Sequence, residues 1–203
     1  MSPTAGASPP TDRRLIGVLA LQGDFAAHAR LLEGLGADVR EVRVPDDLDG
    51  LDGLVLPGGE STTMMLGIAR ERLADPLRAV AAAGMPILAT CAGLIILDRD
   101  HLGVMDVLCE RNAFGRQVRS FETDLRLAGF DTPVRAVFIR APWIAGHGPG
   151  VDVLGEVDGH VVAAREGRIL AAAFHPELAG ETQLHAWLLA EVRASAAGEP
   201  RPA

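Results

Sequence analysis

The stretch PILATCAGLIIL, Pro86 to Leu97, is apolar at both ends but is interrupted in its middle by small residues around a thiol. A core strand has no need of such a cluster. A strand that turns sharply into a helix does need one, because small neighbours let the residue at the bend stand out from the backbone. The stretch therefore predicts a strand over 87–90, a bend at Cys91 and a helix that begins at Ala92.

The same alternation of strand and helix extends toward the N-terminus. Apolar runs that end in turn-forming residues are typical of buried parallel strands, and helical patterns stand between them. Asp24 is the expected cap of the first helix, and the helical segment after Ser61 is expected to be interrupted near Asp75 and Pro76. The predicted strands lie in 14–24, 38–44 and 51–56. This pattern predicts an α/β fold of the flavodoxin-like kind, doubly wound around a mostly parallel central sheet with flanking helices.

The second half of the chain contains more short strand patterns than the first. A final helix is expected over about 181–192. The strand patterns lie in 103–110, 118–127, 134–139, 151–157, 160–164 and 169–174. We find no internal repeat and no linker, so one domain is predicted over 13–194, between disordered tails at 1–12 and 195–203.

Composition restricts the classes of function. The chain has 203 residues, of which 27 are acidic and 19 basic, and the net charge of −8 argues against general nucleic-acid binding. No apolar run is long enough for a membrane span, and the first ten residues do not have the pattern of a signal peptide. With only two cysteines, a reducing cytoplasm is expected. Every basic residue is Arg, and without Lys no side-chain Schiff base can form.

The bend matches the logic of a nucleophile elbow. Ala89 and Gly93 stand two residues before and after Cys91, where a strained turn requires small side chains. The turn would place the sulfur at a helix N-terminus, which favours the thiolate, and the N–H of Ala92 could stabilise an oxyanion. The alternative is a buried structural cysteine, which is how we interpret Cys109.

A thiolate nucleophile needs a base, and His175 is the best candidate. It follows the apolar strand pattern RILAAAF, and Pro176 ends that strand. Glu177 is two residues further on, so in an extended segment it would share a face with His175 and could orient the imidazole. The alternative is an ordinary histidine at a strand end beside a solvated glutamate. The remaining histidines stand on predicted helices, as His28 and His185 do, or on turns and strand starts, as His101, His147 and His160 do.

A third feature is the pair Gly58-Gly59 after a predicted strand. Paired glycines let the backbone approach a ligand and present N–H groups in conformations that other residues avoid. The alternatives are a plain tight turn, or a phosphate-binding loop, which lacks its Lys here.

A glycine loop, a cysteine elbow and a late His-x-Glu in this order resemble the class I, or triad, glutamine amidotransferases. More specifically, the chain resembles the family of glutaminase subunits of pyridoxal 5′-phosphate synthase, from about Leu15 to Leu189. The segments PGGESTTM and ERNAFGRQ are specific to that family. The other matching segments are GVLALQGDFAAH, TCAGLIIL, VFIRAPWI and AAAFHPEL. The chain departs from the family in having Ala89 where glycine is usual.

The resemblance implies a Cys91, His175 and Glu177 triad that hydrolyses L-glutamine through a γ-glutamyl thioester. It implies that glutamine is bound by Gly59, Glu60, Ser61, Arg111, Ile139 and Arg140, with Gly59 and Ala92 as the oxyanion hole. The ammonia would pass to a (β/α)8-barrel synthase subunit that makes pyridoxal 5′-phosphate from a pentose phosphate and a triose phosphate. We expect no cofactor and no metal. Gln22 is the candidate link between the partner and the glycine loop.

Three alternatives remain from the sequence. The first is a glutaminase subunit that serves another synthase. The second is a cysteine hydrolase or chaperone on a related sheet, in which a histidine commonly follows the elbow cysteine in place of Ala92. The third is an inactive scaffold that only binds the synthase.

Overall fold

The computed structural model describes residues 13–111 and 120–198. The predicted N-terminal tail, residues 112–117 of the ERNAFGRQ segment, the first two residues of the strand predicted over 118–127 and the last five residues of the chain lie outside the described residues.

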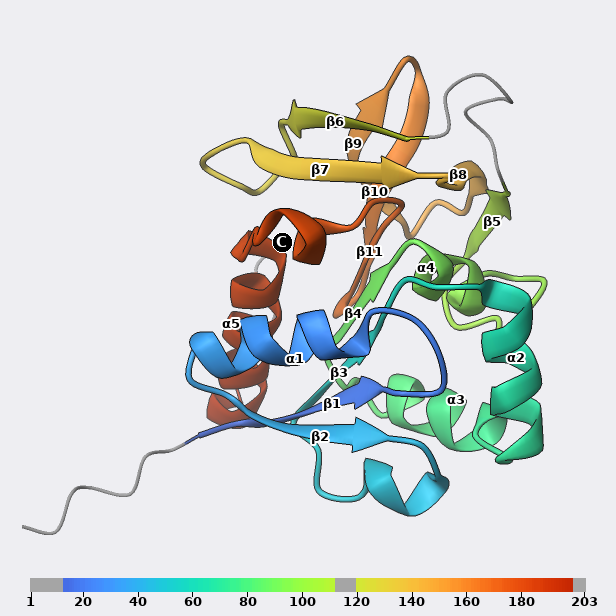
Figure 1. Cartoon of the computed structure of the whole chain (residues 1–203), viewed down its shortest axis with the longest axis vertical. Helices are drawn as coiled ribbons and strands as arrows, with labels where there is room; N and C mark the ends of the chain where they lie inside the picture. The colour runs from blue at the N-terminus through green and yellow to red at the C-terminus, as the bar shows by residue number, and fades with distance from the viewer. Residues whose placement is uncertain (1–12, 112–119, 199–203) are drawn as a thin grey trace, which may run out of the picture.

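The centre of the fold is a sheet whose first half is parallel (Figure 1). Its strands follow the order β2-β1-β3-β4-β11, and each neighbouring pair runs in the same direction. This order is the doubly wound arrangement of flavodoxin-like folds. The strands are β1 (Leu15–Leu19), β2 (Asp38–Val42), β3 (Gly53–Leu56), β4 (Ile87–Thr90) and β11 (Ile169–Ala172). The predicted α/β fold with a mostly parallel central sheet is confirmed.

Helices flank this sheet and bury its apolar strands. Figure 1 shows α1 and α5 on one side of the parallel strands and α2 and α3 on the other. Every residue of β3, β4 and β11 is buried, as expected for strands that are covered on both faces. The helices are α1 (Phe25–Gly34), α2 (Ser61–Arg70), α3 (Ala74–Ala82), α4 (Ala92–Leu97), α5 (Gln183–Ala197), and the short 3₁₀ helices η1 (Pro45–Leu48) and η2 (Pro176–Ala179).

The second half of the chain extends the sheet with antiparallel strands. β10 pairs with β11, β8 and β9, and β5 pairs with β8, while β6 and β7 form a separate two-stranded ribbon. The strands are β5 (Val107–Glu110), β6 (Ser120–Leu125), β7 (Val134–Ile139), β8 (Trp143–His147), β9 (Asp152–Val157) and β10 (His160–Glu166). Strand β8 was not predicted, because its short segment contains a glycine, is flanked by Pro and Gly, and fully buries only Ile144.

Two helix predictions need correction. The chain leaves α2 at Glu71 to Leu73, where Arg72 has φ of 58°, whereas Asp75 and Pro76 lie in the first turn of α3. Proline is tolerated there because the first N–H groups of a helix have no partner within it. The tail predicted from residue 195 begins too early, because alanines continue α5 to Ala197 and Gly198 ends it with φ of 68°.

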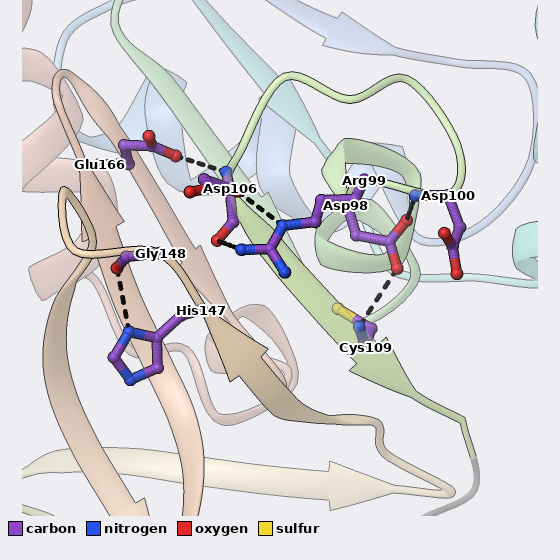
Figure 2. Close-up of polar contacts among 8 residues, drawn as sticks. All are labelled: Asp98, Arg99, Asp100, Asp106, Cys109, His147, Gly148 and Glu166. Atoms are coloured by element: carbon purple, nitrogen blue, oxygen red, sulfur yellow. Dashed lines mark hydrogen bonds and ion pairs between the residues drawn. The ribbon is translucent and has the colours of Figure 1, made fainter.

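The end of α4 is tied to β5 by one buried carboxylate (Figure 2). Asp98 caps the helix and accepts the N–H of Asp100 at 3.0 Å and the N–H of Cys109 at 3.2 Å. Its Oδ1 also lies 2.6 Å from His101 Nδ1. These bonds satisfy a buried charge and fix the loop between α4 and β5, so α4 is held at both ends.

Candidate active site

Three neighbouring parallel strands deliver the predicted site residues to one edge of the sheet. Gly58 and Gly59 follow β3, Cys91 follows β4, and His175 follows β11. They surround a cavity of about 410 Å³, a size within the ~300–1,000 Å³ that is usual for small-molecule sites. It is lined by Gln22, Asp24, Gly59, Glu60, Ser61, Cys91, Ala92, Ile95, Arg111, Ile139, Arg140, Pro142, His175 and Leu178.

The elbow has the strained backbone that its sequence predicts. Cys91 has φ of 46° and ψ of −104°, a conformation that non-glycine residues rarely adopt. The Cys91 N–H donates to the carbonyl of Ala172 in β11 at 2.7 Å, which holds the bend. A Cβ at Gly93 would clash with the carbonyl oxygen of Leu56, so glycine is required for α4 to pack on β3. The methyl group of Ala89 is completely buried in β4.

His175 lies beside the carboxylate of Glu177 and lines the same cavity as Cys91. Its Nδ1 lies 2.7 Å from Glu177 Oε1. The local backbone differs from the prediction: Pro176 begins η2, so Glu177 approaches from a 3₁₀ turn and not from an extended segment. The His–Glu contact is nevertheless made.

The two side chains stabilise each other's charged forms. Burial alone would lower the pKa of His175, but the hydrogen bonds and negative charges of Cys91 and Glu177 outweigh it and raise the pKa to about 10. Burial alone would raise the pKa of Glu177, but the hydrogen bonds from His175 and His28 outweigh it and lower the pKa to about 2. The site therefore favours an imidazolium at His175 beside an ionised Glu177.

The glycine loop is packed directly on the base. A side chain at Gly58 would occupy the position of the His175 ring, and a Cβ at Gly23 would clash with the carbonyl of Gly58. Gly59 has φ of 154°, and a Cβ there would clash with Gln22. The predicted proximity of Gln22 to this loop is observed as a hydrogen bond, in which the Glu60 N–H donates to Gln22 Oε1 at 2.6 Å.

The remaining predicted residues form the polar rim of the cavity. Glu60 caps α2 by accepting the N–H of Thr63 at 3.0 Å, and this bond is the main cause that lowers the Glu60 pKa. Arg111 Nη2 lies 3.7 Å from Glu60 Oε1. Arg140 has φ of 44° and, with Ile139 at the end of β7, lines the opposite part of the cavity. All predicted site residues except Glu177, which lies behind His175, thus border one space, while their roles stay predictions.

Sequence reasoning missed several residues of this region. Asp24 lines the cavity, and its side chain makes no capping bond to α1. Among the described residues, Asp24, His175 and Glu177 are the group close enough to hold an ion, but two of them form the hydrogen-bonded acid–base pair. His28 and His185 are completely buried behind Glu177. A signal existed for His28, because it stands three residues after Phe25 and four before Leu32, on the apolar face of α1.

The other cysteine and the other histidines lie away from the cavity. The Cys109 thiol faces the carbonyl of Leu94 at 3.9 Å, and burial followed by the charge of Asp98 raises its pKa. His101 contacts Asp98, and His160 stacks on Trp143 with ring centroids 3.5 Å apart. Among residues 13–111 and 120–198, no helix combines the length and the apolarity that crossing a bilayer requires.

Comparisons with known proteins agree with this geometry. Residues 18–194 match the family described as the SNO glutamine amidotransferase family. The chain is 50% identical to the pyridoxal 5′-phosphate synthase subunit PdxT of Acidothermus cellulolyticus, over 92% of this chain and 98% of that protein. It is 52% identical to PdxT of Corynebacterium diphtheriae, over 86% and 98%. A solved structure described as a glutamine amidotransferase superposes with a TM-score of 0.82 at 42% identity, covering 88% of this chain and 98% of that one.

Proposed function

The chain belongs to the SNO glutamine amidotransferase family, and from that premise we propose that it hydrolyses L-glutamine to L-glutamate and ammonia with a Cys91, His175 and Glu177 triad. The observation that carries the proposal is the arrangement of these residues: Cys91 at a strained elbow lines the same cavity as His175, and His175 is hydrogen-bonded to Glu177. This is the geometry of an activated nucleophile, its base and the group that orients the base.

In the proposed reaction, Cys91 Sγ attacks the carboxamide carbon of glutamine and forms a tetrahedral intermediate. His175 then gives its proton to the departing nitrogen, which leaves as ammonia and yields the γ-glutamyl thioester. Water attacks the thioester, His175 takes a proton from that water, and glutamate is released with the thiol restored. Glu177 stays ionised throughout and stabilises the imidazolium.

The rim of the cavity has charges that suit the amino-acid end of glutamine. The guanidinium groups of Arg111 and Arg140 match an α-carboxylate, which favours two parallel hydrogen bonds from arginine. The carboxylate of Glu60 matches an α-ammonium group. Ser61, Gly59 and Ile139 would complete the contacts along the substrate.

The developing oxyanion needs N–H donors, and Gly59 and Ala92 are the proposed pair. Ala92 is the first residue of α4, and the first N–H groups of a helix have no acceptor within it. Gly59 lies in a loop where a peptide can turn at little steric cost. Because Gln22 contacts this loop, it is the proposed link through which a partner switches the donor on.

The proposed recipient of the ammonia is a barrel-shaped synthase subunit that makes pyridoxal 5′-phosphate in the cytoplasm. Relatives at about half identity over nearly their whole length carry the name of that synthase. The absence of lysine supports this division, because imine chemistry on the sugar phosphates would then belong to the partner. A glutaminase serving another synthase is the alternative.

The test is glutamine hydrolysis by the chain alone and with the barrel subunit co-expressed. The proposal expects weak activity alone and a steep rise as the partner is titrated in, accompanied by pyridoxal 5′-phosphate formation from glutamine. No hydrolysis in either preparation would reject the glutaminase. Hydrolysis that responds to a different synthase would favour the alternative.

A further inference from the structure

The carboxylate of Glu177 has a second partner on the side away from the thiol. Its Oε1 lies 2.7 Å from His175 Nδ1, and its Oε2 lies 3.4 Å from Nε2 of His28 on α1. The side chains of Glu177 and His28 are completely buried. Among the described residues, no group makes a hydrogen bond of good geometry to Oε2, so the ion-pair contact with His28 is what compensates this buried oxygen.

His28 is in turn held by two further elements. Its Nδ1 lies 2.9 Å from Nε2 of His185 on α5, and its Nε2 lies 3.2 Å from Oγ1 of Thr90 on β4. His185 and Thr90 are also completely buried. A chain of polar contacts therefore runs from His175 at the cavity through Glu177 and His28 to His185, and it ends in the core.

The positions of the protons follow from the neighbours of each nitrogen. Burial, followed by the charge of His28, lowers the pKa of His185 to about 3, so His185 is neutral and has one N–H. At His28 Nε2 only an N–H is attracted by the Glu177 carboxylate, because a lone pair would be repelled by it. His28 Nδ1 faces a nitrogen that either donates to it or accepts from it. When His185 is the donor, the single hydrogen of a neutral His28 ring lies on Nε2, which faces the Glu177 carboxylate and the Thr90 hydroxyl.

We propose that His28 is a positioning residue of the glutaminase: its Nε2–H fixes the second oxygen of Glu177, and His185 fixes the orientation of the His28 ring. The inference rests on the proposed function. A carboxylate held at both oxygens cannot rotate, so it keeps the His175 ring aimed at the thiol. Neither His28 nor His185 lines the cavity. Loss of the His28 donor is therefore expected to lower kcat and to leave KM for glutamine unchanged.

Two amide substitutions at residue 28 separate positioning from packing. In His28→Gln the amide nitrogen takes the place of Nε2 and keeps a donor for Glu177. In His28→Asn the amide reaches only the place of Nδ1 and faces His185. In the complex with the barrel subunit, we expect kcat of His28→Gln within a few-fold of the wild type and kcat of His28→Asn lowered by about 10–100-fold, as for other outer partners of catalytic groups.

A double-mutant cycle with Glu177→Gln provides the readout that a structural role would not move. If His28 acts through Glu177, the His28→Asn loss disappears in the Glu177→Gln background. Thermal unfolding of each variant gives the folded fraction by which kcat is corrected. Equal losses of corrected kcat in His28→Gln and His28→Asn overturn the inference, as does an undiminished His28→Asn loss in the Glu177→Gln background.

Glutamine hydrolysis by the wild-type complex separates a failure of the role of His28 from a failure of the proposed function. If the wild-type complex does not hydrolyse glutamine, the proposed function has failed. If it does, and His28→Asn matches it in corrected kcat, only the role of His28 has failed. Should His28→Asn not fold, His28→Gln and His185→Asn decide the question: a folded His28→Gln or His185→Asn with a raised KM and an unchanged kcat contradicts positioning.

Discussion

The two thiols of this chain lie near opposite ends of α4 and differ in their neighbours more than in their exposure. Cys91 precedes the helix, is 7% exposed, and lines the same cavity as the imidazole of His175. Cys109 lies beyond the helix in β5, is also partly buried, and faces a carbonyl oxygen and the carboxylate of Asp98. Burial therefore does not distinguish the proposed nucleophile. A strained backbone and a place beside His175 at the cavity do.

The largest test of this comparison replaces each thiol in turn. Cys91→Ser is expected to lower glutamine hydrolysis by several orders of magnitude, because a hydroxyl is a much poorer nucleophile than a thiol in the same site. Cys109→Ser is the matched control and is expected to retain activity in the folded protein. A glutamine-analogue electrophile followed by peptide mapping should modify Cys91 alone. Modification of Cys109 would reverse the assignment.

The cavity beside Cys91 allows a second, smaller test. If Arg140 and Arg111 bind the carboxylate of glutamine, Arg140→Ala or Arg111→Ala should raise KM by about 10–100-fold, because hydrogen bonds to charged groups contribute about 1.5–3 kcal/mol. The value of kcat should change less. Arg30→Ala, on the exposed face of α1, is the control. An unchanged KM together with a lower melting temperature would indicate that the arginines serve only the fold.

The elbow at Cys91 depends on the close approach of Gly93 to the carbonyl of Leu56. The position of Cys109 does not depend on such an approach. Gly93→Ala places a methyl group against the carbonyl of Leu56 and is expected to cost about 1–3 kcal/mol of unfolding free energy, with loss of activity as the elbow shifts. Gly34→Ala, in α1 with open space around it, should not destabilise the fold. Chemical denaturation of both variants makes the measurement. Equal stabilities would show that α4 can move away from β3 freely.

The smallest expected effect is that the stability of the fold depends on pH in opposite directions at Glu177, which lies behind the site of Cys91, and at Cys109. The lowered pKa of Glu177 stabilises the fold above its unfolded value of ~4.3, and this contribution is lost as the pH falls from there toward 2. The raised pKa of Cys109 stabilises the fold below its unfolded value of ~8.5, and this contribution is lost as the pH rises above it.

Melting temperatures of the wild type, Glu177→Gln and Cys109→Ser across pH 3–10 test these signs. Glu177→Gln should remove part of the acid sensitivity, and Cys109→Ser should remove part of the alkaline sensitivity. The loss of stability at alkaline pH that remains in Cys109→Ser is expected to come largely from His175. Because its pKa is raised to about 10, His175 stabilises the fold at low pH, and this contribution falls as the pH rises above its unfolded pKa of ~6.5. Identical curves for all three proteins would contradict the assigned shifts.

Sequence reasoning succeeded where local pattern and tertiary structure require the same residues. The elbow was predicted because its bend needs small residues beside Cys91, and the parallel strands because they are buried on both faces. It failed where pairing partners decide the structure, as in β8, which exists because β5 and β10 bond to it. It also passed over His28, because a polar residue on an apolar helix face reveals its partners only in three dimensions.

The late position of β11 in the chain has a consequence during synthesis on the ribosome. The strand inserts between β4 and β10, and its Ala172 carbonyl accepts the Cys91 N–H that holds the elbow. The proposed base, His175, follows three residues later. A nascent chain therefore has its thiol long before it has either the support of the bend or the histidine. The growing polypeptide is therefore expected not to hydrolyse glutamine until nearly the whole domain has emerged and β11, the last parallel strand, is in place.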